Sequence, residues 1–182
     1  GSVAVRWVPA AGLDSLVDHG IRLLGKGEST LGIVLLRSAL ARMPDNPLIL
    51  QNLGMALGNR GELAEALALL GRKTALNPDD AEGWIALGVA LAKSGDVENA
   101  IKALSRSVEL EPDNGYGHLN LGGLLIRRSA DAGMRHLEKA AKLLPKNTAA
   151  QLNWGLALLE SGQPEEADAA LKRTIEIAPL SE

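Results

Sequence analysis

The stretch "WIALGVALAKSG" at residues 84–95 has the pattern of an amphipathic helix that carries a glycine in its middle. Trp84, Leu87, Gly88 and Leu91 fall at i, i+3, i+4 and i+7, which places them on one face of a helix. A glycine inside a helix costs about 1 kcal/mol relative to alanine, so Gly88 needs a compensating role. Related stretches occur as "NLGMAL" at 52–57, "NLGGLL" at 120–125 and "NWGLAL" at 153–158. The internal glycine is therefore a repeated feature of the chain.

Five prolines give the period of this repeat. They lie 34, 34, 33 and 34 residues apart, at Pro44, Pro78, Pro112, Pro145 and Pro179. Registered on these prolines, the chain divides into units 1 to 5, at residues 13–46, 47–80, 81–114, 115–147 and 148–181. The eighth residue of every unit is then a glycine, and a leucine aligns in every second half, at Leu36, Leu70, Leu104, Leu137 and Leu171. The alignment predicts five copies of one structural unit.

Each unit has the pattern of two helices joined by a turn. In unit 3, a second helical stripe includes Ala100 and Leu104, and Pro112 ends it because proline cannot continue a helix. Glycines mark the turn in four units, at Gly27, Gly61, Gly95 and Gly162. Unit 4 lacks this glycine and is one residue shorter, so we expect a different turn there. We expect Gly88 to lie opposite Ala100, because small residues let two helix axes approach closely.

These aligned residues resemble the tetratricopeptide repeat, a 34-residue helix–turn–helix with the pattern W-x2-L-G-x2-Y, then A-x3-F, then P. Unit 3 matches this pattern at Trp84, Leu87, Gly88, Ala100 and Pro112. The resemblance implies an all-α fold, a right-handed α-α superhelix (a solenoid) of about ten antiparallel helices. We expect residues 13–181 to form one array. Residues 1–12 are expected to be an upstream linker or a cloning remnant that begins with Gly-Ser.

The composition argues against several classes of chemistry. The chain has no cysteine, so disulfides, thiolate catalysis and cysteine-ligated metals are excluded. The histidines His19, His118 and His136 are scattered along the sequence, and we interpret two as helix-packing residues and one as a surface residue. The glycines follow the repeat period and form no phosphate-binding loop. We therefore expect no catalytic residue, no metal, no cofactor and no enzymatic activity. No apolar run approaches the roughly 18 residues of a membrane span.

Basic residues gather in unit 4. They are Arg127, Arg128, Arg135, Lys139, Lys142 and Lys146, against only Asp131 and Glu138. This cluster could bind an acidic partner or RNA, but no aromatic residues interleave with it for base stacking. We interpret it as a solvated outer face and do not expect nucleic acid as a partner.

A groove is the expected binding surface, since the first helix of each unit lines the concave face in arrays of this family. The sixth residues of units 2, 4 and 5 are Asn52, Asn120 and Asn153. A side-chain amide both donates and accepts, so it can pair with a peptide backbone of any sequence. The remaining candidate groove residues are mostly apolar: Gln51, Met55, Ile85, Val89, Leu119, Leu156 and Tyr116. The arrangement resembles the asparagine ladder of O-linked N-acetylglucosamine transferase repeats, and it lacks the carboxylate clamp of chaperone-binding arrays. Asparagine as a solvated filler is the alternative.

Three functions remain open from the sequence. The first is a non-enzymatic scaffold that binds a peptide or partner segment in the groove. The second is a structural scaffold that self-associates through uncapped repeat ends, because the apolar flank of 164–177 is expected to be open. The third is the substrate-recruiting arm of a larger, glycosyltransferase-like enzyme. The Ala-, Leu- and Gly-rich composition is typical of a bacterial protein, and the cytoplasm is favoured as its location, although the native targeting segment is expected to be missing.

Overall fold

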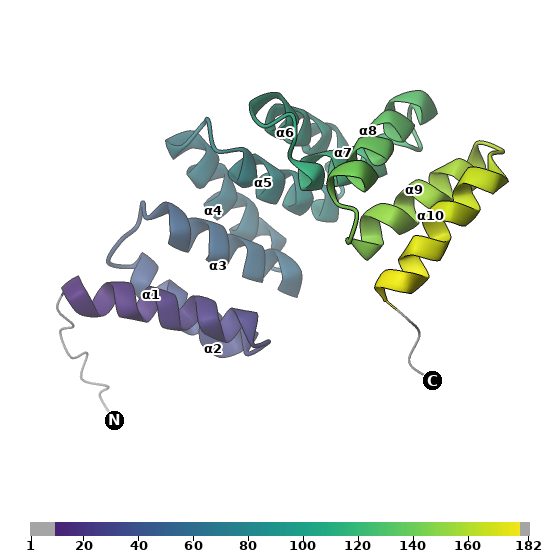
Figure 1. Ribbon diagram of the computed structural model, residues 1–182. Coiled ribbons are helices and arrows are strands. Elements are labelled where there is room, and N and C mark those ends of the chain that lie inside the picture. The colour runs from purple at the N-terminus through teal and green to yellow at the C-terminus, as the bar shows by residue number, and fades with distance from the viewer. Residues whose placement is uncertain (1–9, 179–182) are drawn as a thin grey trace. The chain divides into compact units, whose positions relative to one another are not determined.

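The computed structural model describes residues 10–178, which form ten α-helices without a β-strand (Figure 1). The helices are α1 (Ala10–Gly25), α2 (Ser29–Leu40), α3 (Pro47–Arg60), α4 (Leu63–Leu76), α5 (Ala81–Ser94), α6 (Val97–Leu110), α7 (Gly115–Leu125), α8 (Ala130–Leu143), α9 (Thr148–Glu160) and α10 (Pro164–Ile177). Each predicted unit contains two of them, so the all-α, helix-pair fold is confirmed. Because α1 begins at Ala10, residues 10–12 of the expected linker are helical, and residues 1–9 lie outside the described part.

The chain divides into two compact parts. The N-terminal part, residues 1–78, contains α1 to α4, and the C-terminal part, residues 79–182, contains α5 to α10. The division falls in the linker between units 2 and 3, within two residues of the predicted unit boundary. The single array over 13–181 stays a prediction.

Each new helix pair starts at an asparagine or aspartate. This residue stands two positions after Pro44, Pro78, Pro112 and Pro145. Asn46 accepts hydrogen bonds from the backbone N–H groups of Leu48 and Ile49. Asp80, Asn114 and Asn147 cap α5, α7 and α9 in the same way. Such a cap contributes about 1 kcal/mol because it satisfies N–H groups that have no partner within the helix. The proline therefore ends one unit and the capping residue begins the next.

The turn inside a unit depends on glycine in a left-handed conformation. The four glycines predicted at this turn are the glycines with positive φ in the described residues, for example Gly61 (83°) and Gly95 (86°). Unit 4 builds its turn differently, as expected. There α7 ends at Leu125, and Gly133 of α8 lies directly against the backbone of Ile126, where a Cβ atom would collide. Unit 4 therefore uses a close helix contact where the other units use a left-handed glycine.

Two kinds of contact hold the helices together. Within a unit the two helices pack against each other, and the second helix then packs against the first helix of the next unit, as in α6 with α7 and α8 with α9. The aligned glycine of each first helix faces the aligned leucine of the second: a Cβ on Gly54 would lie 2.7 Å from Leu70 Cγ. The expected close approach at Gly88 is confirmed, but its side-chain neighbour is Leu104, and Ala100 contributes only its carbonyl oxygen.

Candidate functional site

Two clefts in the C-terminal part lie between successive first helices. The α5–α7 cleft has a volume of about 280 Å³ and is lined by Val89, Ala92, Lys93, Leu104, Asn120 and Leu124. The α7–α9 cleft has a volume of about 210 Å³ and is lined by Gly123, Ile126, Arg127, Leu137, Asn153, Leu156, Ala157 and Glu160. Both lie in one compact part of the chain, so their linings belong to the same body.

The repeat builds the two clefts from equivalent positions. The thirteenth residue of one unit contributes a cation, Lys93 or Arg127, and the sixth residue of the next unit contributes an amide, Asn120 or Asn153. The floor of each cleft is an aligned leucine of a second helix, Leu104 or Leu137. These leucines are buried and lie against Gly88 and Gly122, respectively. The aligned glycine–leucine contact that sets the packing of each helix pair therefore also positions the apolar floor of each cleft.

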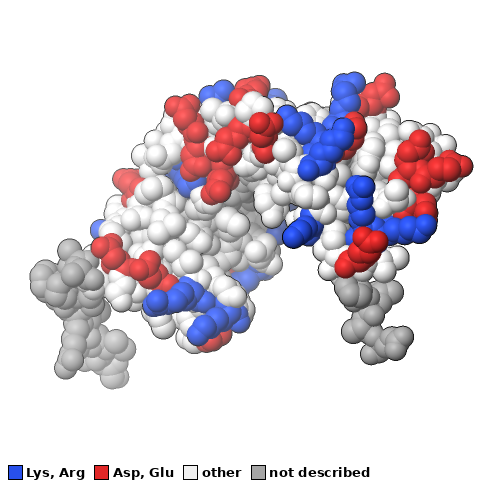
Figure 2. Space-filling view, in the orientation of Figure 1, with Lys and Arg blue, Asp and Glu red and all other residues white. Residues whose placement is uncertain are grey.

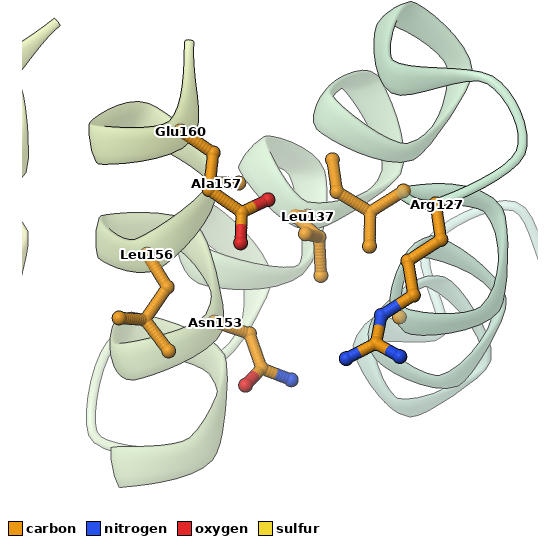
Figure 3. A pocket seen from close by; sticks show the side chains of 8 residues that line it. Arg127, Leu137, Asn153, Leu156, Ala157 and Glu160 are labelled. Carbon is orange, nitrogen blue, oxygen red and sulfur yellow. The ribbon is translucent and has the colours of Figure 1, made fainter. Parts of the chain in front are cut away.

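The polar side chains of the α7–α9 cleft point into it. Figure 3 shows Arg127 reaching in from the turn after α7, and Asn153 and Glu160 from α9. None of the three has a hydrogen-bond or ion-pair partner among residues 10–178. A guanidinium offers only donors, a carboxylate only acceptors, and an amide both. The cleft can therefore bind a ligand that presents carbonyl or carboxylate oxygens together with N–H groups.

Two of the predicted asparagines are partly engaged by their own helices. The Nδ2 atom of Asn120 donates to the carbonyl oxygen of Tyr116 at 2.8 Å, and Asn52 Nδ2 donates to Leu48 O at 2.8 Å. One N–H and the carbonyl oxygen of each amide remain for a ligand. The helix bond fixes the orientation of the amide, so these side chains are positioned rather than freely rotating.

The other predicted groove residues divide into three groups. Val89 and Leu156 line the two clefts. Gln51, Asn52 and Met55 belong to α3 of the N-terminal part, whereas the two clefts lie in the C-terminal part. The third group lies elsewhere in the C-terminal part. Tyr116 lines a different cleft, formed with residues 111–114. Ile85 lies beside Gly117 of α7, and half-buried Leu119 lines neither of the two clefts.

Sequence reasoning did not select Lys93 and Glu160, and it placed Arg127 mainly in the basic cluster. The signal was present in the sequence, because these three residues occupy the thirteenth position, which faces away from the packing stripe. The floor leucines were predicted only as packing residues. A cleft forms over a buried side chain only when neighbouring helices diverge, and this geometry is not readable from the repeat alone.

Three of the six residues in the basic cluster of unit 4 form ion pairs with acidic neighbours. Lys139 pairs with Asp113 at 3.3 Å, Lys142 with Glu138 at 2.6 Å, and Arg128 pairs with Glu98. Figure 2 shows acidic and basic side chains interspersed on the face that it displays. The structure therefore gives no continuous basic surface for nucleic acid on that face.

The histidines are not all scattered in space, which corrects the sequence-based interpretation. His118 and His136 stack with ring centroids 5.0 Å apart, and their Nδ1 atoms are 2.8 Å apart. His118 Nε2 donates to the carbonyl oxygen of Pro112 at 2.8 Å, so its Nδ1 accepts from His136 when both rings are neutral. The His118–His136 contact joins the first helix of unit 4 to the second across 18 residues. A search for metal ligands at local spacing in the sequence therefore misses it. Residues 10–178 contain no group of three metal-ligating side chains.

Burial lowers the pKa of His136 below its usual value, and the charges of His118, Arg135 and Lys139 lower this pKa further. His136 is therefore biased towards the neutral state at neutral pH. Within residues 10–178, no helix has the length and apolar character needed to cross a membrane.

Comparison with solved structures shows the same fold over most of the chain. TTC0263, a thermophilic TPR protein of Thermus thermophilus, is 21% identical, with a TM-score of 0.80 over 93% of this chain and 93% of that one. A MamA protein is 24% identical, with a TM-score of 0.71 over 93% of this chain and 97% of that one. MamA from Desulfovibrio magneticus RS-1, from residue 41 to its end, is 19% identical, with a TM-score of 0.73 over 93% and 97% of the two chains.

Sequence comparison identifies the repeat itself. One tetratricopeptide-repeat family profile matches residues 52–115 and 85–133, and a second matches residues 149–181. No curated protein matches the sequence. The matched residues include the turn glycines Gly61, Gly95 and Gly162 and the prolines Pro78, Pro112 and Pro179, and the chain therefore belongs to the tetratricopeptide-repeat family.

Proposed function

We propose that this chain is a non-enzymatic interaction module that binds an extended peptide segment along α5, α7 and α9. The observation that supports this most directly is the repetition of one cleft at equivalent positions of units 3, 4 and 5. Two like sites in series suit a ligand that is itself a repeating polymer. A polypeptide backbone is such a ligand, since it presents an N–H and a C=O at every residue.

The asparagines would bind the backbone. The amide of Asn120 keeps one N–H and its carbonyl oxygen for a ligand, because its other N–H bonds the carbonyl of Tyr116. Asn153 has both halves of its amide available among the described residues. Each can accept from a backbone N–H and donate to a backbone C=O, as the strands of a sheet do for one another. Recognition of this kind is independent of the peptide sequence.

The remaining lining would select side chains. Leu104 and Leu137 form apolar floors that suit small aliphatic side chains, given cleft volumes of about 280 and 210 Å³. Arg127 has no ion-pair partner within the described residues, so an acidic side chain beside Asn153 would gain a charge-assisted hydrogen bond. Glu160 opposes a second acidic residue at the same cleft. We expect the preferred peptides to contain aliphatic residues for the two cleft floors and a single acidic residue for Arg127.

A peptide-display selection tests this proposal. The native chain is expected to enrich a short motif, and the Asn120→Ala/Asn153→Ala variant is expected to lose that motif while keeping its helical circular dichroism. Arg127→Ala is expected to lose the acidic position of the motif only.

Two matched controls sharpen the selection. Arg128→Ala removes an adjacent cation that is paired with Glu98, and Asn99→Ala removes an exposed asparagine of α6, so both variants are expected to enrich the native motif. The proposal fails if the double asparagine variant enriches the same motif as the native chain, or if the native chain enriches none.

A further inference from the structure

Two histidines of unit 4 occupy positions that are apolar in unit 2. The positions are the fourth residue of the unit and the residue before the aligned leucine of the second helix. In unit 2 they hold Leu50 and Leu69, and both leucines are buried. In unit 4 they hold His118 and His136, whose stacked rings join α7 to α8. Burying an imidazole costs more hydration than burying a leucine, so helix packing alone does not account for the pair.

The setting of His118 is that of a metal ligand. Its Nε2–H donates to the carbonyl oxygen of Pro112 at 2.8 Å, which leaves the ring's lone pair on Nδ1. Histidines that bind metals almost always donate their other ring N–H in this way, because the bond fixes the tautomer and the orientation of the ring. The side chain of His118 is also only 6% exposed, so packing holds the ring in place.

His136 brings a second nitrogen to the same point. The two Nδ1 atoms lie 2.8 Å apart, on either side of one hydrogen atom. Two nitrogens that each bind a tetrahedral zinc ion at about 2.0–2.1 Å lie roughly 3.3–3.4 Å from one another, so a shift of about 0.5 Å makes room for the ion. The ring of His136 is free to make this shift, because the residue is half-buried and its Nε2 atom has no hydrogen-bond partner in the described part of the chain.

We propose that His118 and His136 together bind one divalent transition-metal ion of the zinc, nickel and copper class through their Nδ1 atoms. The ion takes the place of the hydrogen between the rings. His136 gives up that hydrogen and takes one from water at Nε2, so both imidazoles stay neutral. Water completes the coordination on the half-buried side. Imidazole nitrogen suits these ions, whereas Mg²⁺ and Ca²⁺ prefer oxygen ligands.

The charged neighbours weaken this site without excluding a cation. Arg135 and Lys139 of α8 both place positive charge near His136. Lys139, however, pairs with Asp113 at 3.3 Å, and Arg135 is exposed, so solvent screens its charge. The absence of a metal that we expected from the sequence rested on the distance between the histidines along the chain. The bound ion would join α7 to α8 in a unit whose turn lacks a left-handed glycine.

Calorimetric titration of the full chain with Zn²⁺ at neutral pH tests the site. The native chain is expected to bind one equivalent of Zn²⁺ and no Mg²⁺. The ring-proton resonances of His118 and His136 are expected to change together, while those of exposed His19 on α1 stay unchanged. The midpoint of thermal unfolding is expected to rise with the Zn²⁺ concentration and to fall back when EDTA is added, because the ion binds the folded chain.

Three variants separate this site from adventitious binding at the surface. His118→Leu/His136→Leu reproduces the apolar pair of unit 2, so it is expected to keep its helical circular dichroism and to lose the Zn²⁺ site. His136→Gln keeps one ligand and is expected to lose at least about tenfold in affinity, the least that removing a ligand's hydrogen-bond partner costs. His19→Gln removes the remaining histidine of the chain and is expected to bind Zn²⁺ like the native chain.

Four results would overturn the proposal: a native chain that binds no Zn²⁺, a double leucine variant or a His136→Gln variant that binds it like the native chain, or loss of binding in His19→Gln. The His136→Gln result decides the matter if the double leucine variant does not fold. Neither histidine lines a peptide cleft, so peptide selection with these variants reports independently on the proposed function.

Discussion

Gly88 lies so close to Leu104 that no other residue fits without movement: a Cβ atom on residue 88 would come within 2.6 Å of Leu104 Cγ. The same glycine–leucine contact recurs in every unit, with approaches of 2.7 Å for Gly54, 2.8 Å for Gly122 and Gly155, and 3.0 Å for Gly20. The glycine costs helix propensity, and the close packing of the leucine side chain offsets that cost. This relationship explains why an amphipathic helix in each unit carries a glycine at its centre.

Gly88→Ala is expected to lower the free energy of unfolding by up to about 2 kcal/mol. Overpacking typically costs about 1–3 kcal/mol, and the gain in helix propensity of about 1 kcal/mol recovers only part of it. Chemical denaturation followed by circular dichroism measures this difference.

Gly123→Ala is the matched control, because Gly123 lies in α7 and an added Cβ there would meet no neighbouring atom within 4 Å. That substitution is expected to stabilise the chain by roughly 0.5–1 kcal/mol through helix propensity alone. Equal stabilisation by both alanine substitutions would contradict the close-packing explanation.

The His118–His136 pair predicts a loss of stability in mild acid. The pKa of His136 is lowered in the folded chain, so the unfolded chain takes up the proton first as the pH falls. The stabilisation by the neutral pair is therefore complete above the unfolded pKa of about 6.5. It is lost as the pH falls from that value through the folded pKa.

An NMR titration of the histidine ring protons measures this effect directly. His136 is expected to titrate below the ordinary histidine value of about 6.5. The His136→Gln variant is expected to show a weaker dependence of unfolding free energy on pH between about 7 and 5. A His136 resonance that titrates at or above about 6.5 would show that burial does not control the pKa of this residue.

Replacing Gln151 with glutamate is expected to give the opposite pH dependence of stability, with destabilisation that grows as the pH rises. The side chain of Gln151 is fully buried, and its Nε2 donates at 2.8 Å to the carbonyl of Ala141. That carbonyl has no helical donor because residue 145, four positions later, is a proline. The Oε1 atom has no partner among the described residues. An ionised carboxylate there would face a carbonyl with no donor, at a cost of about 3 kcal/mol or more.

Gln151→Glu is therefore expected to destabilise the chain at pH 7 and to do so less at about pH 4, where a protonated carboxyl group can donate to Ala141. The folded pKa of the new glutamate is raised, so its destabilising effect grows as the pH rises above the unfolded value of about 4.3. Gln163→Glu, on an exposed residue before α10, is expected to change stability by no more than about 0.5 kcal/mol. A similar effect of both substitutions would show that residue 151 is not buried as described.

The repeat made most of the fold predictable. The proline and glycine positions indicated the helix pairs, and the positive φ of Gly95 follows from a turn that only glycine adopts without strain. The contact between Gly88 and Leu104 was not predicted, because sequence alignment shows which residues share a face but not how two helices interlock. The His118–His136 contact was missed for a related reason, since it joins two helices across 18 residues.

The candidate site was predictable only in part. Asn120 and Asn153 were selected as sixth residues and do line equivalent clefts, whereas Tyr116 was selected and lines a different one. Tyr116 stands second in its unit, about one turn of helix before the sixth position, and this offset along the helix axis decides which cleft it faces. Glu160 was not selected, although it occupies the thirteenth position of unit 5, which faces away from the packing stripe.

The central claim is that a peptide binds along α5, α7 and α9 in the two equivalent clefts. The most direct measurement is an NMR titration of the 182-residue chain with a peptide obtained from the selection, following the side-chain amide resonances of the asparagines. Binding along the clefts predicts that the resonances of Asn120 and Asn153 shift together and saturate at one ratio of peptide to protein, while Asn99 on α6 stays unchanged. Saturable binding that leaves both cleft asparagines unshifted would contradict the claim.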